Sequence, residues 1–188
     1  MKNLGFAVLL MAITVMLGGT ALAIDDGNHY FTTYFSNANT ANAPDATVRI
    51  INDGSTGYDL YAAIYVFDDS EELTECCDCE VTPDGLLSES VNNNLTANPL
   101  TGIRPTRGVI KIISSSIEDS ATVGNPTGGL HAWATHVQKL PSGYAVSESL
   151  FADSNLAPSE EQLLYELCYF DLKLSGKPCT CTPEDSDF

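Results

Sequence analysis

Basic side chains are scarce in this sequence. Its 188 residues include 8 Lys and Arg against 25 Asp and Glu, and the formal net charge is −17. Binding to nucleic acid or to an anionic membrane surface requires a positive field, so neither partner class is expected. Charged residues make up only 18% of the chain, so the acidity reflects missing bases more than abundant acids.

Signatures of catalysis are also missing. The sequence has no Gly-x-Ser-x-Gly elbow, no His-Glu-x-x-His helix, no phosphate-binding Gly loop and no Asp-x-Asp-x-Asp-Gly calcium loop. His131 and His136 are five positions apart, which places them on opposite faces of a strand, where they cannot easily share a metal ion. We therefore expect no catalytic residue, no metal and no cofactor.

The acidic residues leave two alternatives open. Carboxylates at 68–75 and at Asp25-Asp26 could bind Ca²⁺, although such loop acids are more often only solvated. A hydrolase with paired carboxylates is the third functional alternative, and no pair is singled out by its sequence context. The triplet Asn94-Leu95-Thr96 matches the N-glycosylation sequon, which often arises by chance.

Only the N-terminus carries a long apolar run. Lys2 precedes apolar residues 4–17, and Ala21-Leu22-Ala23 has the small-x-small form that signal peptidase accepts. We expect residues 1–23 to be a cleaved signal peptide, because the run is short for a membrane anchor. No membrane span then remains, and the protein is expected to be secreted, to the extracellular space or cell surface, with the periplasm as an alternative.

The six cysteines form two groups, Cys76, Cys77 and Cys79, then Cys168, Cys179 and Cys181. An even count in an oxidising compartment predicts disulfides. Bridges between close neighbours would close small strained rings. If every bridge instead joins one group to the other, six pairings remain possible. A soft-metal cluster is the alternative, but it would require reduced thiols.

Alternating and β-branched patterns predict strands at 29–35, 46–51, 58–67, 109–114, 129–137 and 144–151. The turn at 52–57 predicts a hairpin over 46–67, and Pro141-Ser142-Gly143 predicts a second hairpin. Residues 58–67 are largely apolar on both faces, which is typical of a central strand covered on each side.

Two helices are expected. A short one starts at Thr82-Pro83 and ends near Asn94. The longer helix spans 158–174, with an apolar stripe formed by Leu163, Leu164, Leu167, Phe170 and Leu174. The fold class is therefore mainly β: an antiparallel β-sandwich of Ig-like or Greek-key type with one short helix and one C-terminal helix, stapled by disulfides. The expected divisions are 1–23, an N-terminal strand and linker at 24–45, one β-rich domain at 46–182, and an acidic tail at 183–188.

The N-terminal strand is the first candidate site. It carries Tyr30, Phe31, Tyr34 and Phe35 and precedes an Asn/Ala/Thr-rich segment, 36–43, expected to be a flexible linker. Such a strand can pair with its own sheet, or it can add to a neighbouring subunit and build a fibre.

Two aromatic faces are further candidates for binding. Tyr61, Tyr65 and Phe67 alternate along one strand, and His131 and Trp133 share a face of another. The simpler interpretation of both is a half-buried aromatic face of a sheet.

The sequence resembles an uncharacterised family of secreted bacterial six-cysteine proteins. The resemblance rests on Cys76-Cys-Asp-Cys-Glu-Val-Thr-Pro-Asp-Gly-Leu86, on residues 93–102, on Leu167-Cys168-x-Phe170 and on Gly-Lys-Pro-Cys-Thr-Cys at 176–181. It covers about two thirds of the chain after residue 23. It implies export and the six-cysteine framework, and it brings no known activity.

We expect a non-catalytic cell-surface or extracellular structural protein, with self-assembly into filaments through the N-terminal strand as its specific form. The alternative is a monomeric extracellular module that binds a glycan or a protein.

Overall fold

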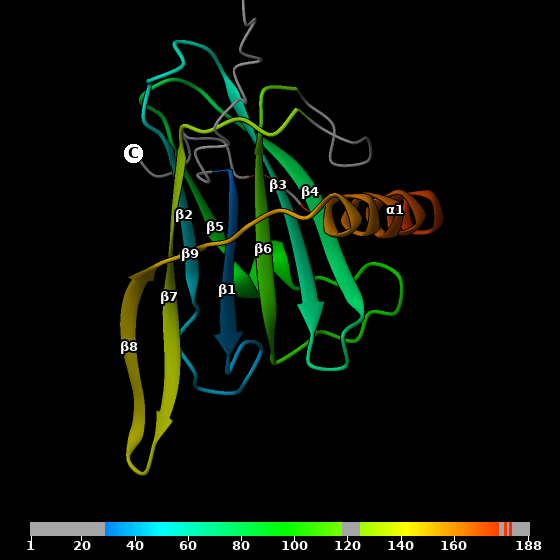
Figure 1. The fold of residues 1–188 in the computed structure, drawn as a ribbon. Coiled ribbons are helices and arrows are strands. Elements are labelled where there is room, and N and C mark those ends of the chain that lie inside the picture. The colour runs from blue at the N-terminus through cyan, green and yellow to red at the C-terminus, as the bar shows by residue number, and fades with distance from the viewer. Residues whose placement is uncertain (1–28, 118–124, 177–178, 180, 182–188) are drawn as a thin grey trace, which may run out of the picture.

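Two antiparallel sheets pack face to face in the computed structural model, which describes residues 29–117, 125–176, 179 and 181 (Figure 1). Sheet A has the order β4-β3-β6-β1-β9 and sheet B the order β5-β2-β7-β8. The strands are β1 (Tyr30–Ser36), β2 (Thr47–Asn52), β3 (Leu60–Asp68), β4 (Leu73–Val81), β5 (Leu86–Ser90), β6 (Arg107–Ser115), β7 (Leu130–Leu140), β8 (Gly143–Leu150) and β9 (Ala152–Asp153). The prediction of a disulfide-containing antiparallel β-sandwich with a C-terminal helix is confirmed.

The main core lies between the sheets. Alternate side chains point into it, and those that are completely buried include Val48, Ile50, Leu60, Ala62, Ile64, Val66, Ile110 and Ile112. A second, smaller core lies on the outer face of sheet A, where Tyr65 and Ala63 pack with Leu164 of helix α1 (Pro158–Ser175). Strand β3 is therefore covered on both faces, as its apolar sequence predicts.

The predicted hairpin over 46–67 is wrong. Strand β2 pairs with β5 and β7, whereas β3 pairs with β4 and β6, so the two strands lie in different sheets. The turn between them is a corner held by Asn52, whose Nδ2 donates to the carbonyl oxygens of Val81 (2.9 Å) and Tyr58 (3.1 Å). The second predicted hairpin is confirmed, because β7 pairs with β8 from Trp133 to Leu140.

The short helix predicted from Thr82 to Asn94 is also wrong over most of its length. Strand β5 occupies its middle, with Leu87 buried and Leu86 exposed, and only a single π-helical turn follows, η1 (Val91–Leu95). The turn is capped by Ser90, whose Oγ accepts from the Asn93 backbone N–H at 2.8 Å. The apolar residues whose spacing predicts a helix thus include Leu86–Ser90, where side chains alternate between exposed and buried as in a strand.

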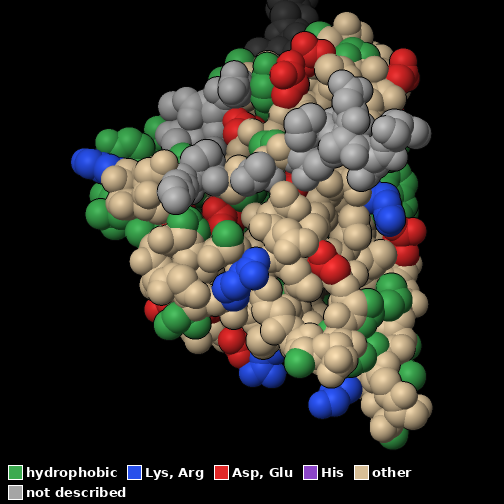
Figure 2. Space-filling view, turned by 180° about the vertical axis from the view of Figure 1, so that it is seen from behind, with side chains coloured by type: hydrophobic (Ala, Val, Ile, Leu, Met, Phe, Trp, Pro, Cys, Tyr) green, Lys and Arg blue, Asp and Glu red, His purple; other side chains and the backbone are tan. Residues whose placement is uncertain are grey.

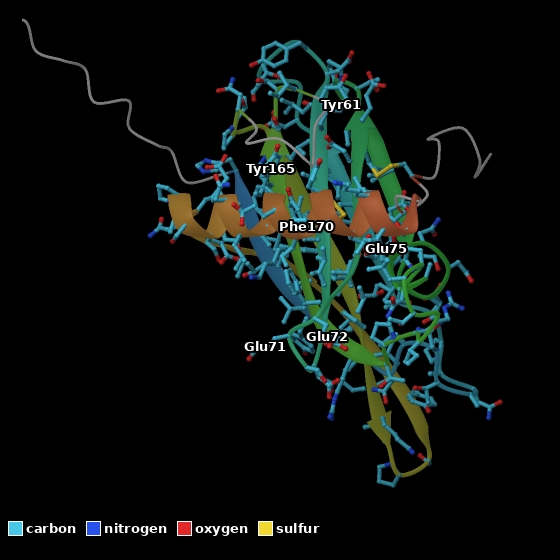
Figure 3. All side chains as sticks on the ribbon, turned by 90° about the vertical axis from the view of Figure 1, so that its right-hand side faces the viewer. Tyr61, Glu71, Glu72, Glu75, Tyr165 and Phe170 are labelled. Carbon is cyan, nitrogen blue, oxygen red and sulfur yellow. A yellow bond between two sulfur atoms is a disulfide. The ribbon has the colours of Figure 1, made fainter. Side chains whose placement is uncertain are left out.

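Helix α1 has the predicted span but buries a different face. Its buried side chains are Leu164, Cys168 and Asp171. Of the predicted stripe only Leu164 is therefore buried, and Leu163, Phe170 (56%) and Leu174 (72%) are exposed. The helix runs across the strands of sheet A (Figure 3) and contacts mainly β4, so only a narrow line of its residues is covered. Within the described ranges, no helix is long and apolar enough to cross a membrane.

Candidate functional site

Disulfides close one side of the sandwich. Each bridge joins one cysteine group to the other, as predicted, and the pairs are Cys76–Cys168, Cys77–Cys179 and Cys79–Cys181. The backbone N–H of Cys179 donates to the Cys76 carbonyl oxygen at 3.1 Å, so residue 179 lies against the outer edge of β4. We call this the stapled side: β4, α1 and residues 179 and 181. Three disulfides are characteristic of a protein that matures in an oxidising compartment.

The three sulfur atoms of Cys77, Cys79 and Cys181 lie within 4.8 Å of one another. All three belong to disulfides, and a disulfide sulfur is not the thiolate that binds soft metals. The geometry therefore supports the disulfide interpretation of the cysteine cluster over the metal alternative.

Two buried carboxyl groups lie on the stapled side, Glu75 on β4 and Asp171 on α1. Glu75 is 1% exposed and Asp171 is 3% exposed. The carboxyl group of Asp171 has no hydrogen-bond partner within the described part of the chain, whereas a backbone hydrogen bond from Asn98 to Glu75 partly offsets the rise in its pKa. Burial, with a smaller effect of the nearby Asp171, raises the pKa of Glu75 to about 8, and burial raises the pKa of Asp171 to about 6. Glu75 is labelled near α1 in Figure 3, and its register partner on β3 is Val66, which belongs to the core between the sheets.

The predicted N-terminal strand forms part of its own domain. Strand β1 pairs with β6 along its whole length, and Tyr30, Phe31 and Phe35 are buried. Tyr34 is 49% exposed and stacks on His136, with ring centroids 4.4 Å apart. Sequence reasoning placed His136 facing away from His131 but did not connect it with Tyr34, because the two strands belong to different sheets.

The other edge of β1 is only partly covered. Strand β9 pairs with it at Phe31 and Thr32 alone, and the Ser154 N–H donates to the Tyr30 carbonyl oxygen at 2.9 Å. Hydrogen bonding alternates along an antiparallel strand, so the backbone groups of Tyr34 and Ser36 point toward the same edge beyond the end of β9.

A hollow of about 420 Å³ opens beside this part of β1. It forms where the chain leaves sheet B at the end of β8 and enters sheet A as β9. Its walls are Thr32, Thr33, Tyr34, Val109, His136, Ser149, Leu150 and Ala152. The His136 Nε2 and Ser149 Oγ are 2.8 Å apart across one wall.

The segment expected to be a flexible linker is anchored instead. The Asn39 Nδ2 donates to Thr96 Oγ1 at 3.0 Å and to the Pro105 carbonyl oxygen at 2.9 Å, and its backbone N–H donates to Asn92 Oδ1. Asn37, Asn39 and Asn42 adopt positive φ, which asparagine tolerates better than most residues. The Asn-rich composition therefore encodes a tight path around the end of the sandwich.

Strand β8 lies at the edge of sheet B and forms a projecting arm with β7. From Gln138 to Leu150, only Tyr144 and Ala145 are partly buried and all other residues are exposed. Hydrophobic side chains are visible along the arm, which extends beyond the body of the molecule (Figure 2), and Val146 is 53% and Leu150 60% exposed. We call β1, β8, β9 and the hollow between them the open side.

The two predicted aromatic faces differ in access. Tyr65 is buried beneath α1, while Tyr61 is half-buried on the same face of β3. His131 and Trp133 share the outer face of sheet B with ring centroids 6.5 Å apart, and the His131 Nε2 lies 3.2 Å from Asp53 Oδ2. Hydrogen bonds from Ser55 and then His131 lower the pKa of Asp53.

Several sequence-based predictions concern residues that the structure does not describe, and the use of the sequon stays a prediction. The expected signal peptide, Asp25-Asp26 and the acidic tail lie outside the described residues. In the sequon, Thr96 is completely buried and its Oγ1 donates to the Val91 carbonyl oxygen at 2.6 Å, so Asn94 lies in a structured turn.

No family model matches this sequence, and no curated protein matches it. The chain is similar to a solved structure from Thermotoga maritima, titled "Crystal Structure of Thermotoga maritima 1070", with 10% identity and a TM-score of 0.44. The likeness covers 69% of this chain and 97% of that chain. It is too weak to carry an argument about function.

Proposed function

We propose that this protein is a secreted, non-catalytic structural protein whose copies assemble through strand β1. The observation that carries the proposal is the uncovered edge of β1 beside the hollow of about 420 Å³. A strand of a neighbouring copy that entered this hollow would continue the line of β9 and pair with the backbone groups of Tyr34 and Ser36.

The surroundings of the titratable groups support a non-catalytic role. Glu75 and Asp171 are buried, and His131 and His136 each contact a neighbouring side chain of the domain, Asp53 and Ser149. The net charge of −17 makes copies repel one another at low ionic strength. Assembly through backbone pairing should therefore strengthen as salt screens this repulsion.

Proline substitution on β1 tests the proposal. Tyr34→Pro removes a backbone N–H that points to the open edge and leaves the bonds to β6 in place. Tyr34→Thr is the matched control, because it removes the same aromatic ring and keeps the N–H. We expect filaments or large oligomers of the wild type and of Tyr34→Thr in negative-stain microscopy, and none with Tyr34→Pro. A wild type without assemblies at any salt concentration would refute the proposal.

A monomeric binding module is the second candidate, favoured by one observation. A hollow of about 230 Å³ lies beside His131 and is also lined by Phe31, Ala132, Leu150, Phe151 and Asp153. Trp133, the single tryptophan, is two residues from His131, and the two ring centroids are 6.5 Å apart. Its fluorescence should therefore report on a ligand in this hollow. Titration with a panel of soluble glycans should shift this emission if the module binds a glycan, and Trp133→Phe should remove the signal.

A further inference from the structure

The outer edge of β8 is open over its whole length. Among the described residues β8 pairs only with β7, and in Figure 1 nothing lies beyond it on that side of the molecule. An exposed two-stranded ribbon is marginally stable alone, so the arm gains stability from a further strand.

The hydrogen bonds to β7 identify which backbone groups are available. The Phe151 N–H donates to the Ala132 carbonyl oxygen at 2.9 Å, and the register pairs Trp133 with Leu150. Because bonded and non-bonded pairs alternate, the N–H and C=O groups that point away from β7 belong to Tyr144, Val146, Glu148 and Leu150.

This edge lacks the devices that normally prevent strand addition. Its sequence, Gly-Tyr-Ala-Val-Ser-Glu-Ser-Leu, contains no proline and no lysine, and its pairing with β7 shows no bulge. The one charged side chain, Glu148, is paired with Arg49 of β2. At the far edge of the other sheet, in contrast, residue 179 lies against β4.

The edge is complementary to itself in one antiparallel register. With a two-fold axis at Ser147, Val146 faces Glu148 of the second copy and Tyr144 faces its Leu150, so all four outward residues pair with one another. A shift that centres the axis on Glu148 would oppose two carboxylates. A shift that centres it on Val146 would pair Leu150 with Ser142 in the turn, outside the strand.

We propose that the outer edge of β8 pairs with β8 of a second copy of this chain about a two-fold axis, joining two B sheets into one continuous sheet. The contact is separate from the proposed role of β1. A two-fold contact closes on itself and yields dimers, whereas a filament needs a second, head-to-tail interface.

The test uses the protein purified with its disulfides formed, studied by sedimentation velocity over a wide concentration range. Val146→Pro removes an outward N–H without touching the bonds to β7, and Val146→Thr is the matched control that keeps it. We expect a concentration-dependent dimer as the smallest assembly of the wild type and of Val146→Thr, and a dimer dissociation constant at least about tenfold higher for Val146→Pro.

Cysteine crosslinking tests the register without depending on the proline variant. Ser147→Cys places two thiols opposite each other at the two-fold axis and should form a disulfide-linked dimer under mild oxidation. Ser149→Cys is the matched control, because in this register its two copies lie several residues apart and should remain uncrosslinked.

Three results would overturn the proposal: a strict monomer at every concentration, a dimer unaffected by Val146→Pro, or equal crosslinking at positions 147 and 149. The failure of each proposal is distinguishable. If Tyr34→Pro abolishes assembly and Val146→Pro leaves it unchanged, the result supports β1 assembly alone. If a two-fold dimer survives Tyr34→Pro but weakens with Val146→Pro, the result supports β8 pairing alone.

Discussion

The two sides of the sandwich end in opposite ways. On the stapled side, three disulfides tie α1 and residues 179 and 181 to β4. On the open side, β8 has a free edge and β9 covers only two residues of β1. One side is closed by covalent bonds within the chain, and the other leaves backbone groups available to another chain.

This difference separates stability from association. Substitutions on the stapled side should change the free energy of unfolding. Surface substitutions on the open side should change mainly the tendency to associate, because few of its contacts are buried. The following predictions test this division, from the largest expected effect to the smallest.

Reduction of all three disulfides should have the largest effect. Loops of 92 and 102 residues are released, and the chain-entropy model assigns on the order of 5 kcal/mol to such a loop, with smaller additions from the other bridges. Urea unfolding with and without reductant measures the loss. An unchanged midpoint would show that the stapled side contributes little. Val146→Pro with intact disulfides serves as the comparison and should unfold near the wild-type midpoint.

Phe35→Ala should be an exception to this division and lower the free energy of unfolding. Phe35 belongs to β1 on the open side, but its side chain is only 2% exposed. The cavity should cost about 3–5 kcal/mol in the free energy of unfolding. Tyr34→Ala, on the neighbouring exposed position, should cost about 1 kcal/mol or less. Equal losses for the two variants in urea unfolding would contradict the burial of β1. By the same reasoning, deletion of residues 24–43 should unfold the domain.

The buried acids make the stapled side sensitive to pH. The pKa of Glu75 is raised to about 8 and that of Asp171 to about 6, so the folded state retains protons that the unfolded state releases. Stability should therefore fall by several kcal/mol as the pH rises from about 4 to about 8. Urea midpoints across this range should show the slope. Glu75→Gln should flatten it above pH 6, and Asp171→Asn should flatten mainly its lower part.

Arg49→Ala should have the smallest effect. The Arg49–Glu148 pair lies on the open side with side chains 42% and 46% exposed. Exposed ion pairs contribute about 0.5 kcal/mol or less, and salt screens them. A loss above about 1 kcal/mol in urea unfolding would mean that the arm is more tightly coupled to sheet B than its exposure indicates.

The sequence was most informative where side chains alternate or cysteines cluster. The strands at 29–35, 58–67 and 144–151 and the pairing between cysteine groups were predictable, because period-two patterns and ring strain are local properties. The hairpin over 46–67 was not, because turn chemistry at 52–57 is the same whether the chain returns to one sheet or crosses to the other.

Helix α1 shows a second limit. The predicted stripe, Leu163, Leu164, Leu167, Phe170 and Leu174, and the buried line, Leu164, Cys168 and Asp171, both have helical spacing and share only Leu164. Only tertiary packing decides which of the two is buried. The charged Asp171 concealed the second stripe. The candidate site was half predictable for a similar reason: Tyr34 and β1 follow from local pattern, but the open edge of β8 depends on strand order, which is not local.

The pleat of β4 has a consequence for how the chain matures. Cys76 faces α1, whereas Cys77 and Cys79 face the core between the sheets. The three thiols leave the ribosome long before their partners, which lie near the end of the chain. Once β4 has formed, Cys76 points to the opposite face from Cys77 and Cys79 and cannot easily bridge to either. The strand thus separates Cys76, which faces Cys168 on α1, from Cys77 and Cys79, which face the side where residues 179 and 181 lie.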